Sequence, residues 1–145
     1  MKLITMFLLC ISLCKNCSSS SQNDLKNAVV EYTASTRGFY TKITIKNQQI
    51  SISKDRNATY PAKETKISDA DWQELIELFK TIDLKTISTL KAPTEKRFYD
   101  GAAIGNLKVN YKEKEYQSSA FDHGFPPEEI KKVVEKINSF VKKEE

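Results

Sequence analysis

Two early segments of the chain have the residue pattern of β-strands. Residues 28–35 are rich in Val, Thr and Tyr, and residues 39–46 alternate apolar with polar side chains. A period of two places the alternating side chains on opposite faces of a strand. We therefore predict two strands here, the second with one face buried and the other face in contact with water.

A short polar break after residue 46 predicts the first β-hairpin. With Asn47–Gln48 at its tip, Ile45 faces Ile50 and Ile43 faces Ile52 across the strand pair. Cross-strand pairs of β-branched residues stabilise a sheet, and two-residue turns favour this register. The third strand therefore continues the same apolar face.

A second hairpin is expected nearer the C-terminus. Residues 107–111 again alternate apolar with polar side chains, and polar residues follow them. A turn centred on Glu113–Lys114 sets Tyr111 opposite Tyr116. The stretch between the two hairpins, residues 55–66, is polar and broken by Pro61, and we read it as a connection.

The clearest helix signal begins at Ser68, which is followed three residues later by Asp71 in a variant of the capping box. Ile67 and Trp72 occupy the positions of a hydrophobic staple. Trp72 also opens an apolar series at helical spacing, which favours core packing over a role as a binding aromatic. The series is Trp72, Leu75, Ile76, Phe79 and Ile82.

A second helix is expected to start at Pro127, because proline suits the first turn and Glu128–Glu129 match the positive helix end. Its apolar stripe comprises Ile130, Val133, Val134, Ile137, Phe140 and Val141. One-faced strands and one-faced helices together predict an α+β fold, with an antiparallel sheet of about five strands in the order ββ(β)αββα and both helices on one face.

The N-terminus has the pattern of an export signal. Lys2 precedes an apolar run from Leu3 to Leu13, which is far shorter than the roughly 20 residues that a membrane-spanning helix needs. We predict a signal or lipoprotein leader over residues 1–17, a flexible Ser-rich tether over 18–26, and one domain over 27–145.

The three cysteines, Cys10, Cys14 and Cys17, all lie in this leader. A cysteine just after the apolar run indicates a bacterial lipoprotein, with the lipid on Cys14 or alternatively on Cys17. We therefore expect export to the bacterial cell envelope and anchoring in a membrane. The alternative is ordinary cleavage, which would leave a soluble secreted or periplasmic protein.

Charge and composition exclude several classes of function. The formal charge is +4, and it falls to +2 once Lys2 and Lys15 are removed with the leader. A nearly balanced surface argues against nucleic acid as the partner. The domain after Cys17 has no cysteine and one histidine, so we expect no thiolate chemistry, no zinc site and no cofactor. We also expect a monomer.

Candidate catalysis centres on His123, the only histidine, which follows Asp122. A His beside an Asp resembles a general base, and a small hydrolase would use His123, Asp122 and Asp100. No nucleophile motif of the G-x-S-x-G type accompanies them. A structural loop residue is therefore favoured over a catalytic one, and we expect no enzyme.

Three loops carry arginine and aromatic residues, the types enriched at binding hot spots. If the loops share one edge of the sheet, they form a recognition surface; the alternative is that they are buried against the sheet. The residues concerned are Arg37, Phe39, Tyr40, Arg97, Tyr99, Asp100, His123 and Phe125.

The cysteine-tipped leader, the serine tether and the order of elements resemble the small lipoproteins of Bacteroidetes. The domain is also similar, at low specificity, to the emfourin-type inhibitors of bacterial metalloproteases. The points of likeness are Arg37-Gly38-Phe39, Arg97-Phe98-Tyr99 and the helix start at Pro126-Pro127. This resemblance implies a non-catalytic binding module, with protease inhibition as one form of it.

Three hypotheses of function follow. The leading one is a lipid-anchored binding module that meets a protein partner in the cell envelope. The second is the hydrolase based on His123 and Asp122. The third is a carrier of a small ligand, which requires a pocket between the sheet and the helices.

Overall fold

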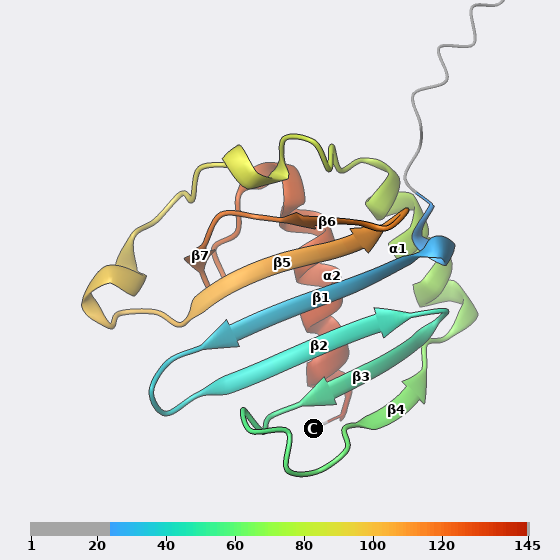
Figure 1. Cartoon of the computed structure of the whole chain (residues 1–145), viewed down its shortest axis with the longest axis horizontal. Helices are drawn as coiled ribbons and strands as arrows, with labels where there is room; N and C mark the ends of the chain where they lie inside the picture. Colours follow the sequence, from blue (N-terminus) through green and yellow to red (C-terminus); the bar gives the residue numbers. More distant parts are fainter. Residues whose placement is uncertain (1–23, 145) are drawn as a thin grey trace, which may run out of the picture.

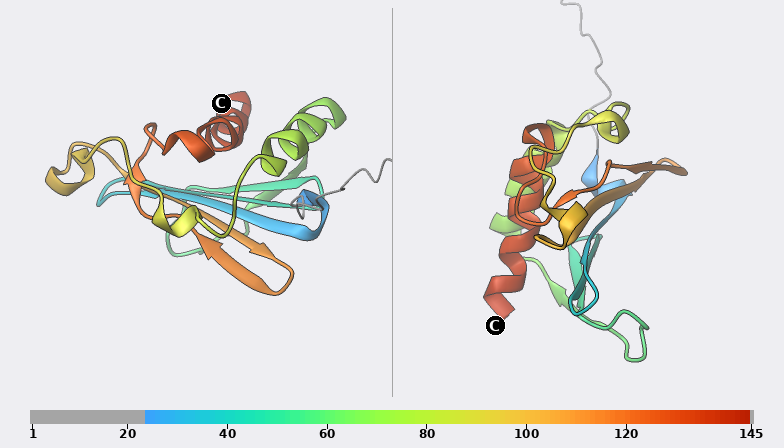
Figure 2. Two further views of the ribbon diagram at one scale, coloured as in Figure 1. Left: turned by 90° about the horizontal axis from the view of Figure 1, so that it is seen from above. Right: turned by 90° about the vertical axis from the view of Figure 1, so that its left-hand side faces the viewer.

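A twisted antiparallel sheet with two helices on one face makes up the described part of the chain, residues 24–144 of a computed structural model (Figure 1). The strand order is β4-β3-β2-β1-β5-β6, and β7 pairs with β5. Both α-helices lie on the same side of the sheet (Figure 2). The predicted α+β class is confirmed. The elements are η1 (Leu25–Asn27), β1 (Ala28–Ser35), β2 (Tyr40–Lys46), β3 (Gln49–Ser53), β4 (Lys63–Lys66), α1 (Asp69–Lys80), η2 (Ile87–Thr89), η3 (Lys96–Tyr99), β5 (Ile104–Tyr111), β6 (Lys114–Gln117), β7 (Phe121–Asp122) and α2 (Glu128–Glu144).

The first hairpin has the predicted register. Ile45 pairs with Ile50 and Ile43 pairs with Ile52. Asn47 and Gln48 form the two-residue turn and have φ values of 49° and 63°. Two consecutive positive φ values give a turn whose twist matches that of the strands.

The predicted register of the second hairpin is wrong. Tyr111 pairs with Lys114, and Tyr116 pairs with Val109. The turn residues are Lys112 and Glu113, with φ values of 50° and 61°. This hairpin therefore has the same tight two-residue turn as the first one. Neither Lys112 nor Glu113 is an Asn or a Gly, the residues from which such a turn is usually predicted.

Two strands were not predicted, so the sheet has seven strands within residues 24–144 instead of about five. β4 is an edge strand of which every residue is exposed, and its sequence Lys-Glu-Thr-Lys has no apolar alternation. β7 is two residues long. Neither strand leaves a periodic signal in the sequence.

The helices follow the predicted patterns closely. The Ser68 hydroxyl accepts a hydrogen bond from the Asp71 backbone N–H at 3.2 Å and caps α1. Ile67 and Trp72 are both buried, as the staple requires. In α2 the predicted stripe is buried as far as Phe140, whereas Val141 is only partly buried.

An ion pair joins the two helices. The Lys136 ammonium group on α2 lies 2.8 Å from Asp71 Oδ1 on α1 and also contacts the Glu74 carboxylate. The Lys136 side chain is only 12% exposed, so water screens these contacts less than at an open surface. The contact fixes α2 relative to α1, and α2 forms one wall of the candidate site.

At least three residues that we assigned to the tether pack with the domain. Leu25, which we assigned to the tether, is 1% exposed and belongs to the hydrophobic core. The Asp24 side chain caps η1 by accepting from the Lys26 N–H at 3.0 Å. Residues 24–26 are therefore part of the domain. The predicted leader, with Cys10, Cys14 and Cys17, lies outside the described residues.

Candidate functional site

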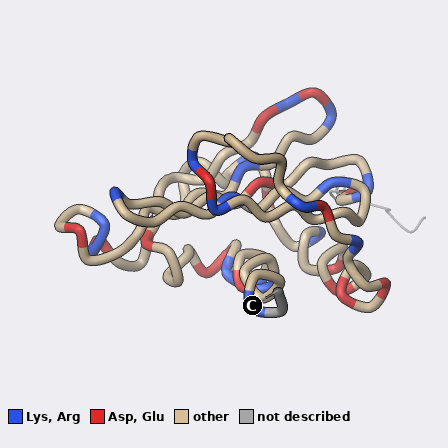
Figure 3. Tube along the Cα trace, turned by 90° about the horizontal axis from the view of Figure 1, so that it is seen from below, with Lys and Arg blue, Asp and Glu red and all other residues tan. Residues whose placement is uncertain are grey.

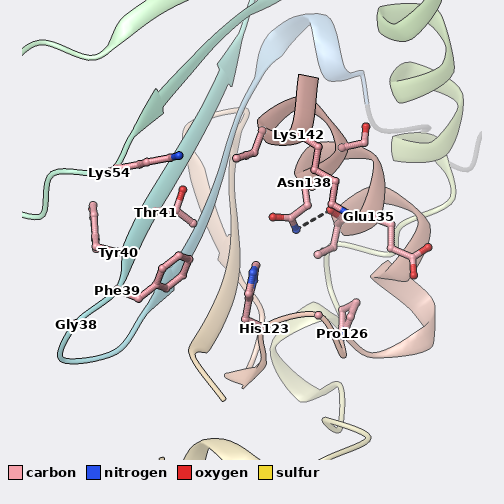
Figure 4. A pocket seen from close by; sticks show the side chains of 14 residues that line it. Gly38, Phe39, Tyr40, Thr41, Lys54, His123, Pro126, Glu135, Asn138 and Lys142 are labelled. Carbon is pink, nitrogen blue, oxygen red and sulfur yellow. Dashed lines mark hydrogen bonds between the residues drawn. The ribbon is translucent and has the colours of Figure 1, made fainter. Parts of the chain in front are cut away.

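An open groove lies between the start of β2 and the C-terminal half of α2 (Figure 4). Its volume is about 840 Å³, within the range of roughly 300–1,000 Å³ that small-molecule sites occupy. We call it the α2 groove. It is lined by Gly38, Phe39, Tyr40, Thr41, Lys54, His123, Gly124, Pro126, Val134, Glu135, Asn138, Ser139, Val141 and Lys142.

Thr41 is the most informative lining residue. Its position in β2 turns the side chain toward α2, on the same face as the buried Ile43. Thr41 is 5% exposed, and its hydroxyl has no hydrogen-bond partner among the described residues. A buried polar group without a partner costs about 1–3 kcal/mol, so the site retains an unfavourable feature that valine would avoid. A ligand that hydrogen-bonds this hydroxyl removes the cost.

His123 enters the groove from the loop after β7, and its ring is held by a buried tyrosine. The Tyr32 hydroxyl on β1 lies 2.6 Å from His123 Nδ1. Burial raises the pKa of Tyr32 to about 12, although a hydrogen bond from the Asn138 side chain acts in the opposite direction. Burial also lowers the pKa of His123. Both rings are therefore neutral near pH 7.

The contact between Tyr32 and His123 allows either donor direction, and the tautomer of the imidazole follows from that direction. The Asn138 amide donates one hydrogen to the Val134 carbonyl at 2.9 Å and bonds to the Tyr32 hydroxyl as well. An arrangement in which the phenol oxygen accepts from Asn138 and the phenol donates its own proton to His123 Nδ1 satisfies both groups. This arrangement leaves the proton of the neutral imidazole on Nε2, which makes Nε2 a hydrogen-bond donor.

The walls of the groove are largely apolar. Phe39 is 43% exposed, and its ring centroid lies 5.8 Å from that of His123. Pro126, Val134 and Val141 extend the apolar lining. The groove therefore combines a broad apolar wall with a few polar groups, which is the usual composition of a binding site for a small ligand.

Three charged residues line the groove within the part of the chain that the structure describes. Lys54 and Lys142 contribute two positive charges and Glu135 one negative charge. Figure 4 shows the Lys54 side chain directed toward Thr41. Over the described chain as a whole, basic and acidic residues are interspersed instead of forming one basic face (Figure 3).

Asp122 does not act on His123, although the two are neighbours in sequence. Successive residues of an extended chain point to opposite sides, and the Asp122 carboxylate points toward residues 94–97. It accepts hydrogen bonds from Thr94 Oγ1 at 2.6 Å, from the Lys96 N–H at 2.7 Å, and from the Arg97 N–H and Nη1 at 3.0 and 3.1 Å. The Asp–His pair that a hydrolase would need is not formed.

The carboxylate of Asp122 stays charged down to strongly acidic pH. Burial raises its pKa, but the hydrogen bonds from Thr94, Arg97 and Lys96 outweigh burial and bring the pKa down to about 2. Arg97 is itself largely buried and forms the ion pair. Both residues therefore hold η3 against the sheet, and Arg97 is structural instead of part of an open recognition surface.

The other predicted recognition residues fall into two groups. Phe39 and His123 meet in the α2 groove. Tyr40 contributes to the lining, but its ring lies under Arg56 at 5.5 Å, and Figure 4 shows it directed away from α2. Arg37 lies in the exposed connection between β1 and β2.

The second group surrounds η3, which projects at the same end of the sheet (Figure 1). Phe98 and Tyr99 are 72% and 71% exposed, and Asp100 follows them with a φ of 57°. The Lys96 ammonium group lies 4.9 Å from the Phe125 ring centroid. A protein partner at this exposed tip and protease inhibition through it both stay predictions.

Sequence reasoning missed most of the groove. The alternation in residues 39–46 puts Thr41 on the same face as Ile43, and its hydroxyl is the available signal, because a polar atom on a buried face needs a partner. No local sequence pattern marks the other polar residues of the site, which are Tyr32, Asn138, Lys54, Glu135 and Lys142. The structure brings Tyr32 and His123 together across 91 residues of sequence.

Metal binding has no support within residues 24–144, where no group of three or more His, Cys, Asp or Glu side chains is placed to hold an ion. None of the described helices is long and apolar enough to cross a membrane. No protein-family model, no curated protein and no solved structure was found to match the chain. Inference of function therefore depends on the chemistry of the groove.

Proposed function

We propose that this protein is an exported, lipid-anchored binding module of the bacterial cell envelope, and that it holds a small ligand in the α2 groove without catalysing a reaction. The observation that carries the proposal is the buried, unpartnered hydroxyl of Thr41 at the wall of an open groove. Binding sites commonly keep such groups for the ligand, because the cost of burial is removed only in the complex.

The arrangement of His123 supports binding over catalysis. Its Nδ1 is engaged by Tyr32, and the neighbouring carboxylate of Asp122 is engaged by η3. Within the described residues, the groove lining includes no cysteine, and its one serine, Ser139, donates its hydroxyl to the Lys136 carbonyl at 2.7 Å. A general base with neither an orienting carboxylate nor a nucleophile to activate has no acyl-transfer chemistry to perform.

A fragment screen observed by two-dimensional ¹H–¹⁵N NMR tests the binding function. We expect hits whose chemical-shift changes centre on Thr41, His123 and Asn138. Ser139→Trp places a large ring in the groove and should weaken these hits by about tenfold or more, which corresponds to a loss of roughly 1.4 kcal/mol.

The control for that variant is Ser51→Trp, which adds the same ring on the face of β3 that turns away from α2. It should leave the hits unchanged. Fragment binding that is absent, or that persists equally in both variants, contradicts a ligand site in the groove.

Export and anchoring are tested separately by mass spectrometry of the mature N-terminus. A diacylglyceryl group on Cys14 or Cys17 supports the anchored form. A free N-terminus at Lys15 supports cleavage and release instead. The result leaves the test of the groove unaffected, because the leader lies outside the domain.

A further inference from the structure

Two neighbouring aromatic side chains project into solvent from η3. Phe98 is 72% exposed and Tyr99 is 71% exposed. The Phe125 ring, itself 47% exposed, lies at the base of η3, where the Lys96 ammonium group is 4.9 Å from its centroid. Single apolar side chains are ordinary on a protein surface, whereas a group of them marks an interaction site. We call residues 95–101 the η3 tip.

The η3 tip is held in place, so its aromatic side chains are presented outward without further ordering. The Asp122 carboxylate accepts a hydrogen bond from the Arg97 N–H at 3.0 Å. The Arg97 guanidinium group lies 4.3 Å from the Phe98 ring centroid. A Cβ atom at Gly101 would come within 3.0 Å of the Tyr99 ring, so the chain folds back closely beneath that ring. A preorganised surface loses little conformational entropy when it binds.

The charges of the η3 tip do not select a strongly charged partner. Glu95 and Asp100 are exposed acids and Lys96 is an exposed base, so both signs occur beside the aromatic rings. Aromatic rings flanked by charged residues are the composition found where a bilayer meets water, because the rings contact acyl chains while the polar groups contact headgroups and water. The tip therefore suits a lipid surface, and its rings supply the attraction.

The chain before the domain is long enough to let the η3 tip reach a membrane that holds the lipid. Cys17 and Cys14 lie seven and ten residues before Asp24. An extended chain spans at most about 3.5 Å per residue, which gives a reach of about 25 or 35 Å. The η3 tip and the first described residues lie at opposite ends of the sheet (Figures 1 and 2), and the eight residues of β1 between those ends span about 26 Å. A domain lying on its long side therefore brings both ends to the bilayer.

We infer that Phe98 and Tyr99 insert into the headgroup region of the membrane in which the protein is anchored, as a second point of attachment beside the lipid. This inference rests on the anchoring in the proposed function and adds the orientation of the domain. The tether confines the tip to a thin layer above the bilayer, so a contact that is weak for a free protein becomes effective for an anchored one. The α2 groove lies beside the start of β2, at the same end of the sheet, and therefore also comes close to the lipid surface.

Fluorescence of the protein on vesicles tests this insertion. Residues 18–145 keep the whole hydrophobic core, which comprises residues between Leu25 and Phe140. A hexahistidine tag at the N-terminus attaches this chain to phosphatidylcholine vesicles that contain a nickel-chelating lipid. The tag takes the place of the natural anchor, so the result does not depend on which cysteine carries a lipid.

Two variants report on the position of the η3 tip. Phe98→Trp and Tyr99→Trp each add an indole ring there, and the wild-type chain, whose Trp72 is buried, supplies the background emission. The emission of either variant should fall by at least about twofold when the acyl chains are brominated close to the headgroup, because bromine quenches only an indole that it approaches closely.

The matched control is Tyr60→Trp. Tyr60 is 77% exposed and lies in the connection between β3 and β4. The emission of this variant should be the same on brominated and on ordinary lipid. Equal quenching in Tyr60→Trp overturns the inference. Absence of quenching in both tip variants also overturns it, and leaves a protein partner as the occupant of the tip.

The outcomes separate this inference from the proposed function. A diacylglyceryl cysteine at the mature N-terminus, with no quenching at the tip, removes the inference and leaves the anchoring in place. A free N-terminus at Lys15 contradicts the anchoring, and the inference then fails with it, whatever the tagged chain shows. Neither result changes the test of the α2 groove, which depends on fragments that bind at a different surface.

Discussion

The Tyr32 hydroxyl and His123 Nδ1 are 2.6 Å apart, although 91 residues separate them in sequence. Tyr32 lies on the central strand β1 and is completely buried, whereas His123 borders the groove. The contact holds the imidazole against the sheet, and a proton donated by Tyr32 would leave the imidazole proton on Nε2. The orientation of a lining residue therefore depends on Tyr32, which is not itself part of the groove lining.

The hydrogen bond of Tyr32 is expected to contribute measurably to stability. Tyr32→Phe removes the hydroxyl and leaves His123 Nδ1 without its partner. We expect the free energy of unfolding to fall by about 1–2 kcal/mol, as for other partly buried hydrogen bonds. Urea unfolding followed by circular dichroism measures this change.

The control is Tyr116→Phe, at a half-buried tyrosine on β6. It should change the free energy of unfolding by less than about 0.5 kcal/mol. A Tyr32→Phe protein as stable as the control would show that the contact with His123 contributes nothing to the fold.

Acid should weaken the domain through His123 in a defined pH range. Burial places the pKa of His123 in the folded protein below the ordinary value of about 6.5. As pH falls, the unfolded chain therefore takes up this proton before the folded one does, and stability decreases. The loss begins near pH 6.5, whereas the carboxylates with lowered pKa values act below about pH 4.

Two measurements check this pH dependence. The protein has a single histidine, so the imidazole NMR signal titrates without overlap, and its midpoint should lie below 6.5. Unfolding free energies at pH 7.5 and 5.5 should differ in the wild type and differ less in His123→Gln. A midpoint at or above 6.5 contradicts the expected effect of burial.

Sequence reasoning was successful where a local period determines the structure. The alternation in residues 39–46 predicted β2 and its buried face, and Ser68 with Asp71 predicted the start of α1. β4 was not predicted because every residue of this edge strand is exposed to water, so the strand needs no apolar face. Its pairing with β3 depends on backbone hydrogen bonds, which any sequence can form.

The candidate site was predictable only in part, because its groups come from distant segments. Phe39 and His123 were both chosen as loop residues, and the structure brings them together. Asp122 precedes His123 in sequence, but in the structure its carboxylate is bonded to residues at the start of η3 and does not contact the imidazole. The pairing of Tyr32 with His123 depends on the packed sheet and has no local signature.

The two hairpin turns offer a comparison that tests the geometry. Gln48 and Glu113 both have positive φ values, 63° and 61°, which glycine adopts without strain. Glu113→Gly should therefore stabilise the protein by about 0.5–1 kcal/mol. Gln48→Gly should not, because the Gln48 amide donates to the Ile67 carbonyl at 2.9 Å and to Asp69 Oδ1 at 2.7 Å.

Thermal unfolding of the two variants measures the difference. The melting temperature should rise in Glu113→Gly and stay level or fall in Gln48→Gly. A fall in both would show that the second turn does not have the left-handed backbone of Lys112 and Glu113. The register of β5 and β6, with Tyr111 opposite Lys114, would then also be in error.

The buried carboxylate of Asp122 is expected to be the most sensitive position in the loops around the site. It accepts hydrogen bonds from Thr94, Lys96 and Arg97. The Arg97 side chain is only 11% exposed, so water cannot readily replace the carboxylate as the partner of the guanidinium group. Asp122→Asn keeps the shape but removes the charge opposite Arg97. We expect a loss of about 3 kcal/mol in the free energy of unfolding, as when one partner of a buried ion pair is removed.

The matching control is Asp100→Asn at the exposed end of η3, where asparagine suits the positive φ of 57° and stability should be unchanged.

The pH profile gives a second readout. The pKa of Asp122 is about 2 in the folded protein and ordinarily near 3.8, so its contribution is complete above pH 4 and is lost as pH falls toward 2. Asp122→Asn should flatten the wild-type decline in that range; an unchanged decline would show that Asp122 is not the carboxylate that stabilises η3 against acid.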